Sequence, residues 1–394
     1  MQLGVQNIAV VDADAHLTEP PDLWTSKLSS HWGDDVPHVE VDPSTGIERW
    51  RIGGTWCAGV GTQSQSGWEA LPPSFPPTWG DIDPACYDLA QRLRWMDQHG
   101  VDAQILYPNV VTFEGHAIKA LKDRDLQVAI FQTYNDYVHQ FTQDARDRLI
   151  PIATVPFWDV DATVAEMTRC AELGFSGIVW AATMDRHGLP PLTHRHWDPV
   201  YQRAQDLGIS INFHVGVGST ADDLANYREL KDGKFDYGYW AGESTLAFLA
   251  NSGTMARLIT SGVCERFPGI NFVSVESGFG FVPFLLEALD WQWRNIGAPA
   301  EHAGWLLPSD YFMRQIHCTF WFEQSALSLL SAYQDNVMFE TDFPHSTALA
   351  PGAASVAPSP RDVVARDAHL VEHDVLEKAL STNARRLYKI GSTG

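Results

Sequence analysis

Acidic residues and histidines recur where apolar segments of this chain end. The first example is residues 10–16, where two valines precede Asp12, Asp14 and His16. Residues two apart in a β-strand point to the same face, so the spacing predicts three ionisable side chains on one face of a strand end. Carboxylates and imidazoles are common metal ligands. This segment alone fits two interpretations, half of a metal site or a solvated strand end that caps a turn.

Three later apolar segments end in the same residue types. One carries His214, the next Glu276, and the last Asp342, which His345 follows. Each residue has a structural interpretation: His214 as a hydrogen-bonded core histidine, Glu276 and Asp342 as caps, and His345 as an exposed loop residue. A dry interior tolerates several ionisable groups only when they are paired or bind a metal. We therefore predict a metal site formed by Asp14, His16, His214 and Asp342.

Predicted strands and helices alternate along the chain around these residues. Near-continuous apolar runs are typical of parallel strands that are buried on both faces. Eight strand–helix units without a glycine-rich phosphate loop favour a closed (β/α)8 TIM barrel, whose active site lies at the C-terminal strand ends. The predicted strands are 10–16, 101–108, 149–157, 175–182, 209–217, 270–277, 316–322 and 337–344. The predicted helices are 86–100, 123–145, 160–174, 198–208, 244–267 with a break near Gly253, 282–295, 324–334 and 373–390.

Residues 20–85 interrupt this alternation. The segment is rich in Pro, Gly, Ser and Trp and shows no sustained hydrophobic period, and its prolines at 72–73 and 76–77 exclude a helix or central strand there. Its tryptophans indicate packing rather than disorder. We predict one barrel domain over residues 1–394, with 20–85 inserted as a lid or a dimer contact.

The charge and the cysteine content of the chain limit which classes of binding partner and which cellular compartment are expected. The 394 residues include 27 basic and 49 acidic ones, and the formal charge of −22 disfavours nucleic acid and anionic membranes as partners. The five cysteines form no CxxC pair, so neither a disulfide framework nor a thiolate zinc site is expected. No secretory signal pattern or membrane-spanning apolar run is present, and we expect a cytoplasmic protein.

Taken together, these motifs resemble the amidohydrolase superfamily, and within it the branch similar to aminocarboxymuconate-semialdehyde decarboxylase. The resemblance covers nearly the whole chain and implies metal ligands at strands 1, 5 and 8, namely Asp14, His16, His214 and Asp342. Barrels of this branch are often dimers, so a homodimer is expected. The motifs are residues 12–16 with Glu19-Pro20, 213–214, 275–278, 341–345 and 383–388.

Two departures from the family pattern make the site rich in carboxylates. The usual HxH of the first strand is Asp14-x-His16, and Glu276 replaces the strand-6 histidine of many members. No lysine ends segment 175–182, which excludes a carboxylated-lysine bridge between two metals. We therefore add Glu276 and His345 to the ligand set. Added carboxylates favour iron or manganese over zinc, and we expect iron, as one or two ions, with zinc and manganese as alternatives.

Three reactions fit such a site. In hydrolysis of an amide, lactone or thioester, Asp342 serves as general base; in decarboxylation, Asp342 assists protonation of the carbon that loses the carboxylate. In oxygenation, ferrous iron keeps open positions for dioxygen. The chain also resembles a non-haem di-iron monooxygenase type of the branch that acts on terpenoids. We expect a non-haem iron monooxygenase, with hydrolase and decarboxylase as alternatives and with catalytic residues Asp342, His214 and Glu276.

Aromatic composition bears on the substrate. The chain has 15 tryptophans and 19 phenylalanines, several of them near strand ends. They predict a large apolar pocket for a bulky hydrophobic, terpenoid-like small molecule. The alternative is that they only seal the barrel and the inserted lobe. A barrel that acts solely as a scaffold is disfavoured, because its ligand set would be broken and this one is intact.

Overall fold

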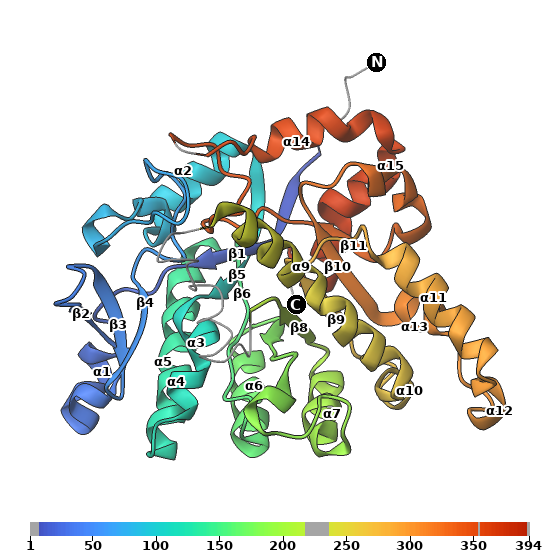
Figure 1. Cartoon of the computed structure of the whole chain (residues 1–394), viewed down its shortest axis with the longest axis horizontal. Coiled ribbons are helices and arrows are strands. Elements are labelled where there is room, and N and C mark those ends of the chain that lie inside the picture. Colours follow the sequence, from blue (N-terminus) through green and yellow to red (C-terminus); the bar gives the residue numbers. More distant parts are fainter. Residues whose placement is uncertain (1–7, 217–235, 354, 392–394) are drawn as a thin grey trace.

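The strands of the computed structural model form a parallel barrel. The structure describes residues 8–216, 236–353 and 355–391. Its parallel strands pair in the orders β1-β5-β6 and β11-β10-β9-β8-β7, with helices around them (Figure 1). The strands are β1 (Val10–Leu17), β5 (Val101–Pro108), β6 (Leu149–Pro151), β7 (Gly177–Val179), β8 (Ser210–His214), β9 (Phe272–Val275), β10 (Ile316–Phe320) and β11 (Val337–Phe339).

Two short parallel bridges close the barrel between these groups of strands. Ala15 pairs with Phe343, and Ala153 pairs with Ile178. At the first join the amide of His16 donates to the carbonyl of Phe343 at 2.6 Å, and the amide of Asp342 donates to the carbonyl of Asp14 at 2.9 Å. The ends of β1 and β11 that carry the predicted ligands therefore lie side by side.

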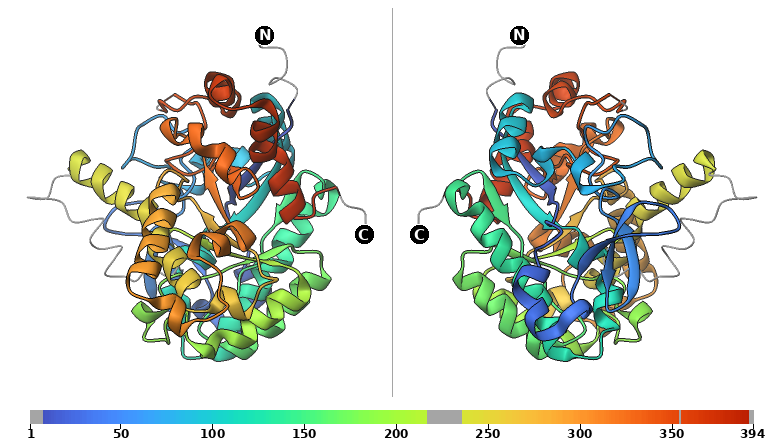
Figure 2. Two further views of the ribbon diagram at one scale, coloured as in Figure 1. Left: turned by 90° about the vertical axis from the view of Figure 1, so that its right-hand side faces the viewer. Right: turned by 90° about the vertical axis from the view of Figure 1, so that its left-hand side faces the viewer.

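Helices cover the outside of the barrel, as Figures 1 and 2 show. Several begin at an aspartate whose side chain accepts a backbone amide, for example Asp88 from Gln91 at 2.9 Å and Asp159 from Ala162 at 3.0 Å. Because Asp88 is the N-cap, the helix predicted over residues 86–100 begins only at Leu89. The main helices are α2 (Leu89–His99), α5 (Arg124–Thr142), α6 (Val160–Glu172), α7 (Asp198–Leu207), α9 (Tyr237–Thr260), α11 (Val282–Asn295), α13 (Pro308–Gln315) and α14 (Pro360–Asp367).

Short helical pieces connect these elements. The segment predicted as helix 324–334 is a 3-10 helix over Ser325–Tyr333. The predicted closing helix is α15 (His373–Glu377), a π-helical turn at Lys378–Thr382 and α16 (Asn383–Leu387). The remaining pieces are α3 (Val110–Phe113), α4 (Gly115–Lys119), α10 (Val263–Arg266) and α12 (Ala298–Glu301).

The predicted break near Gly253 is wrong. Helix α9 continues through Gly253, and the chain leaves the helix at Gly262, which has φ +81°. A glycine inside a helix costs only about 1 kcal/mol, which packing against the barrel can offset. The left-handed backbone at Gly262 cannot continue a right-handed helix.

The inserted segment 20–85 contains more regular structure than its sequence pattern indicates. Helix α1 (Thr25–Trp32) and an antiparallel sheet of β2 (His38–Val41), β3 (Glu48–Ile52) and β4 (Thr55–Gly59) lie to one side of the barrel (Figure 1). These strands are too short for a clear period. The proline-rich part forms no helix or strand, as predicted. The single domain, the lid or dimer contact and the homodimer stay predictions.

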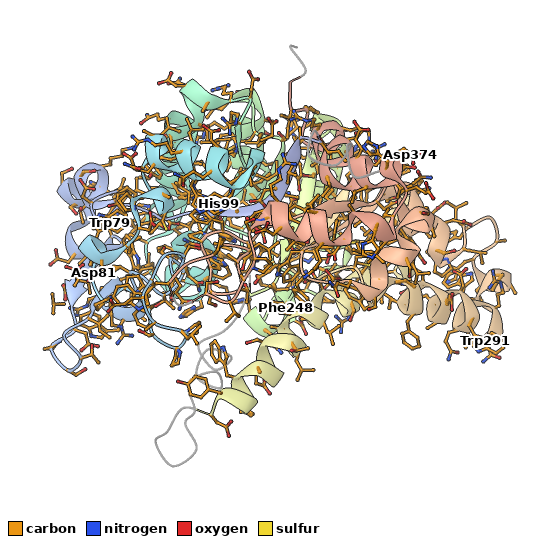
Figure 3. All side chains as sticks on the ribbon, turned by 90° about the horizontal axis from the view of Figure 1, so that it is seen from above. Trp79, Asp81, His99, Phe248, Trp291 and Asp374 are labelled. Carbon is orange, nitrogen blue, oxygen red and sulfur yellow. The ribbon has the colours of Figure 1, made fainter. Side chains whose placement is uncertain are left out.

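The long axis of the molecule runs from this insertion to α11. Figure 3 shows Trp79 of the insertion and Trp291 of α11 at opposite ends. Trp291 is one of the exposed large apolar side chains. In the part of the chain that the structure describes, no helix has the length and apolar character needed to cross a membrane.

Candidate metal centre

Three buried side chains bring donor atoms together at the C-terminal ends of β1 and β8. His16 Nε2 lies 3.1 Å from His214 Nε2. The oxygens of Asp14 lie 3.4 Å from each of these nitrogens, Oδ1 from His16 and Oδ2 from His214. All three side chains are inaccessible to solvent. Residues that are nearly 200 positions apart in the sequence thus converge on one point, as the strand-end pattern predicts.

The second ring nitrogen of each histidine fixes the direction of the first. His16 Nδ1 faces the carbonyl of Pro108 at 3.2 Å, and His214 Nδ1 faces the carbonyl of Val215 at 2.7 Å. A neutral imidazole that donates from Nδ1 carries a lone pair on Nε2. Both Nε2 atoms therefore face each other and the carboxylate of Asp14, and each ring offers a lone pair there when it is neutral. A cation among these atoms would stabilise this arrangement.

The other predicted ligands surround this core. Asp342 Oδ1 lies 3.8 Å from His16 Nε2 and 2.9 Å from His345 Nδ1. Glu276 Oε2 lies 3.7 Å from His214 Nδ1. The described residues form three overlapping groups that could hold a metal ion, and the structure brings together all six predicted residues: Asp14, His16, His214, Glu276, Asp342 and His345.

Unusual backbone marks two of these positions. Glu276 follows β9 with φ +55°, and Asp342 follows β11 with φ +59°. Apart from Lys389, no other non-glycine residue in the described ranges has a positive φ. Such conformations are strained for residues with a Cβ and occur preferentially at functional sites. Both bends lie where a strand ends and a site carboxylate begins.

Burial and mutual repulsion divide the carboxyl groups of the site into charged and neutral ones. Burial, together with the charges of Asp342 and Asp14, raises the pKa of Glu276 well above its usual range. Burial and the charge of Asp14 do the same to the pKa of Glu340. Burial opposes ionisation of Asp14, but the neighbouring charge of His214 outweighs it and holds the Asp14 pKa below its usual range.

The unpartnered oxygens of Asp14 fit a divalent cation. Both are buried and accept no hydrogen bond from the described residues. A buried carboxylate without donors is unfavourable unless a cation lies beside it. Burial, aided by the charge of His345, also lowers the pKa of His16 to about 4, so this imidazole is neutral, as a metal ligand must be.

Asp12 belongs to a different layer of the barrel. Its Oδ1 accepts the amide of Thr341 at 2.7 Å, and its Oδ2 accepts the Thr341 hydroxyl at 2.6 Å and Gln104 Nε2 at 2.9 Å. The pairing of β1 with β5 is irregular between Asp12 and Ala15, which interrupts simple alternation. Asp12 therefore joins β1 to its neighbours and does not belong to the groups of described residues that could hold a metal ion.

Three neighbours of the site were missed by sequence reasoning. Asn109 Oδ1 lies 3.0 Å from His345 Nε2, and the Phe113 ring lies 5.7 to 5.9 Å from the rings of the three site histidines. The Thr347 hydroxyl donates to Asp342 Oδ2 and lies 3.4 Å from Glu276 Oε1. Asn109 directly follows a predicted strand, so the strand-end rule could have found it. Phe113 and Thr347 carried no signal.

A pocket of about 710 Å³, open to solvent, reaches the cluster from the insertion. Residues 65–72 of the insertion line one side, and His345 and Thr347 belong to the other. The amides of Gln65 and Ser66 donate to the carbonyl of Pro344 at 2.9 and 3.0 Å. The insertion is therefore attached to the loop that follows the last strand.

Comparison with known proteins identifies the family. The amidohydrolase family model matches residues 11–390, and the chain belongs to this family. A gamma-resorcylate decarboxylase from Rhizobium sp. is 25% identical over 327 residues, which are 79% of this chain and 90% of that protein. A 2-keto-4-carboxy-3-hexenedioate hydratase from Sphingobium sp. is 26% identical over 203 residues, which are 50% of this chain and 52% of that protein.

Solved structures confirm the predicted TIM barrel. An amidohydrolase from Mycobacterium avium subsp. paratuberculosis superposes with a TM-score of 0.74 at 20% identity, covering 98% of this chain and 99% of that one. A 5-carboxyvanillate decarboxylase from Novosphingobium aromaticivorans with bound manganese has a TM-score of 0.64 at 18% identity, covering 98% of each chain.

These relatives overturn the predicted iron monooxygenase. The similar proteins include decarboxylases of gamma-resorcylate, 2,6-dihydroxybenzoate and 5-carboxyvanillate, which match the decarboxylase alternative. The preference for iron is unsupported as well, since relatives with bound metal hold manganese. Carboxylate ligands suit iron and manganese alike, so the ligand types do not choose between these two metals. The coarser prediction, a site for a divalent metal, is supported.

Proposed function

We propose that this protein is a metal-dependent, non-oxidative decarboxylase of a small aromatic carboxylate with a hydroxyl beside the carboxylate. One observation carries the proposal: the buried oxygens of Asp14 and the Nε2 atoms of His16 and His214 converge beside Asp342. Relatives named for removing a carboxylate from hydroxylated benzoates support the choice of reaction.

The metal would be held by Asp14, His16, His214 and Asp342, and we propose manganese because relatives hold it. When bound, a divalent cation supplies a Lewis acid that neutralises the negative charge of the substrate oxygens. His214 acts as a ligand in this proposal. Phe113, packed against the site histidines, would keep bulk water from the reacting ring.

The chain supplies the proton that decarboxylation consumes. Asp342 donates it to the ring carbon that bears the carboxylate, and a C–H bond forms there. The bond from that carbon to the carboxylate then breaks, its electron pair restores the aromatic ring, and carbon dioxide leaves. Neither dioxygen nor any other electron acceptor enters this balance.

Glu276 is placed to return the proton to Asp342. Burial and the charges of Asp342 and Asp14 raise its pKa and so favour its protonated form, and the Thr347 hydroxyl lies between the two carboxyl groups. Glu276 can donate to Thr347 while Thr347 donates to Asp342. His345 and Thr347 hold Asp342 in place and act as positioning residues.

The test is turnover of hydroxybenzoates by the manganese-loaded protein. 2,6-Dihydroxybenzoate and its isomers with one hydroxyl next to the carboxylate would be incubated in D2O, with and without dioxygen. We expect one carbon dioxide per substrate consumed, one deuterium at the vacated carbon and equal rates in both atmospheres. Dioxygen uptake, solvent oxygen in the product, or no release of carbon dioxide from any isomer would overturn the proposal.

A further inference from the structure

A second pocket lies beside the metal centre, between β4 and the ends of β1 and β5. It has a volume of about 340 Å³ including its opening to solvent, and Glu19, Asn109, Phe113 and Glu114 line it. Phe113 also packs on the site histidines, and Asn109 contacts His345. The pocket and the metal centre therefore share a wall.

Two buried polar atoms in this pocket have no partner. Glu19 is fully buried, and its Oε1 accepts the amides of Asn109 at 3.0 Å and Val110 at 2.9 Å, while its Oε2 accepts no hydrogen bond. Asn109 directs Oδ1 to His345, and its Nδ2 has no acceptor among the described residues. When the Glu19 carboxyl is ionised, the described residues thus leave one acceptor and one donor without a partner beside the pocket. A buried donor or acceptor without a hydrogen bond is energetically unfavourable.

A hydroxyl group satisfies both atoms, because it donates one hydrogen bond and accepts another. A methoxy group can only accept, and a second carboxylate would be repelled by Glu19. We propose that Glu19 and Asn109 bind a substrate hydroxyl remote from the reacting carboxylate and so determine specificity. This inference rests on the proposed function, since it names a further substituent of the same substrate.

Glu114 provides a matched control in the same pocket. It has the same side chain as Glu19, but its Oε1 already accepts the amide of Ala58 at 2.9 Å. Replacing Glu114 by glutamine keeps that acceptor. Replacing Glu19 by glutamine changes the pocket, since the glutamine oxygen must accept the two backbone amides and its NH2 group then faces the pocket. The pocket would hold two donors and no acceptor for a hydroxyl proton.

The test measures binding without turnover. Nitrophenols serve as probes, because a nitro group has the shape of a carboxylate and cannot leave as carbon dioxide. Isothermal titration would compare 2-nitrophenol with derivatives that carry a second hydroxyl or a methoxy group at each ring position, on manganese-loaded protein. A pH of 8.5 is suitable because burial raises the pKa of Glu19 to about 8.

We expect the hydroxyl compound at one ring position to bind about tenfold more tightly than its methoxy counterpart. Glu19→Gln should reduce this ratio to about one, and Glu114→Gln should leave it unchanged, with thermal unfolding to verify that both variants fold. An equal affinity for hydroxyl and methoxy compounds in the wild type would mean that the pocket holds only water. That result, or a preference that survives Glu19→Gln, would overturn the inference.

The two proposals fail separately. Carbon dioxide release without any hydroxyl preference would overturn the role of Glu19 and Asn109 alone. A hydroxyl preference that depends on Glu19, in a protein that releases no carbon dioxide from any hydroxybenzoate, would overturn the decarboxylase proposal and retain the hydroxyl site.

Discussion

Asp12 and Asp14 lie two residues apart on β1 and are equally buried, but their surroundings are opposite. Both oxygens of Asp12 accept hydrogen bonds from Thr341 and Gln104, whereas neither oxygen of Asp14 accepts one from the part of the chain that the structure describes. We call Asp12, Gln104 and Thr341 the supporting layer. We call Asp14, His16, His214 and Asp342 the site layer. Residue type and burial do not distinguish Asp12 from Asp14, but the absence of donors to Asp14 among the described residues does.

The largest expected effect is the loss of a charge from the site layer. Asp14→Asn should abolish stoichiometric metal binding and reduce decarboxylation on the order of 1,000-fold, because the site loses its unpartnered anion. The metal-free variant should still fold but should unfold at a lower temperature than metal-free wild type, because the charge of Asp14 no longer pairs with His214. Elemental analysis, carbon dioxide release and calorimetry check this. Retained metal would place Asp14 outside the ligand set.

The supporting layer should respond in the opposite way. Asp12→Ala leaves the buried donors of Thr341 and Gln104 without an acceptor, and we expect the free energy of unfolding to fall by about 3 kcal/mol. Urea denaturation of metal-free protein measures the loss, and Asp12→Asn, which keeps one acceptor oxygen, should lose less. Wild-type stability in the alanine variant would show that Asp12 does not support the barrel.

An effect of intermediate size is expected at Thr347. This residue contacts two carboxyl groups of the site and is not a metal ligand in our account. Thr347→Val should lower kcat about tenfold with unchanged metal content, because Asp342 loses the hydroxyl that positions it and relays its proton. Thr347→Ser keeps the hydroxyl and is the control. Steady-state kinetics with metal analysis would refute the relay if the valine and serine variants had equal kcat.

The last prediction is a pH dependence caused by Glu19, which has one hydrogen-bonded oxygen and one oxygen without a partner among the described residues. Burial raises its pKa from 4.5 to about 8, so folding favours the protonated form. The stability of the metal-free protein should therefore gain from Glu19 protonation at low pH and lose about 1 kcal/mol per pH unit within the range from 4.5 to 8. Urea denaturation at several pH values measures this slope. Glu19→Gln should reduce the slope by about 1 kcal/mol per pH unit, and Glu114→Gln should leave it unchanged.

The barrel and the membership of the site were predictable for a physical reason. Parallel strands buried on both faces require apolar runs, and a barrel brings their C-terminal ends together, so polar residues at those ends must meet. His214 and Asp342 were predicted by this rule and lie with Asp14. The rule does not extend to loops, where Phe113 and Thr347 gain their roles from contacts between distant segments.

Local irregularities in the structure explain the features that could not be predicted from the sequence. Strict alternation would give Asp12 the same role as Asp14, and the irregular pairing before Ala15 separates them. The short strands of the insertion are stabilised by pairing with one another, which a search for sequence periods does not detect. The types of the ligand residues also do not determine the reaction, because the same carboxylates and histidines bind several metals and support several chemistries.

Manganese titration of metal-free protein tests the central claim most directly, with bound metal and carbon dioxide release from the best hydroxybenzoate measured on the same samples. Our account predicts that activity rises in proportion to bound metal and reaches its plateau at one manganese per chain, and that the Asp14→Asn variant shows neither. Carbon dioxide release at full rate by metal-free protein, or by Asp14→Asn, would contradict it.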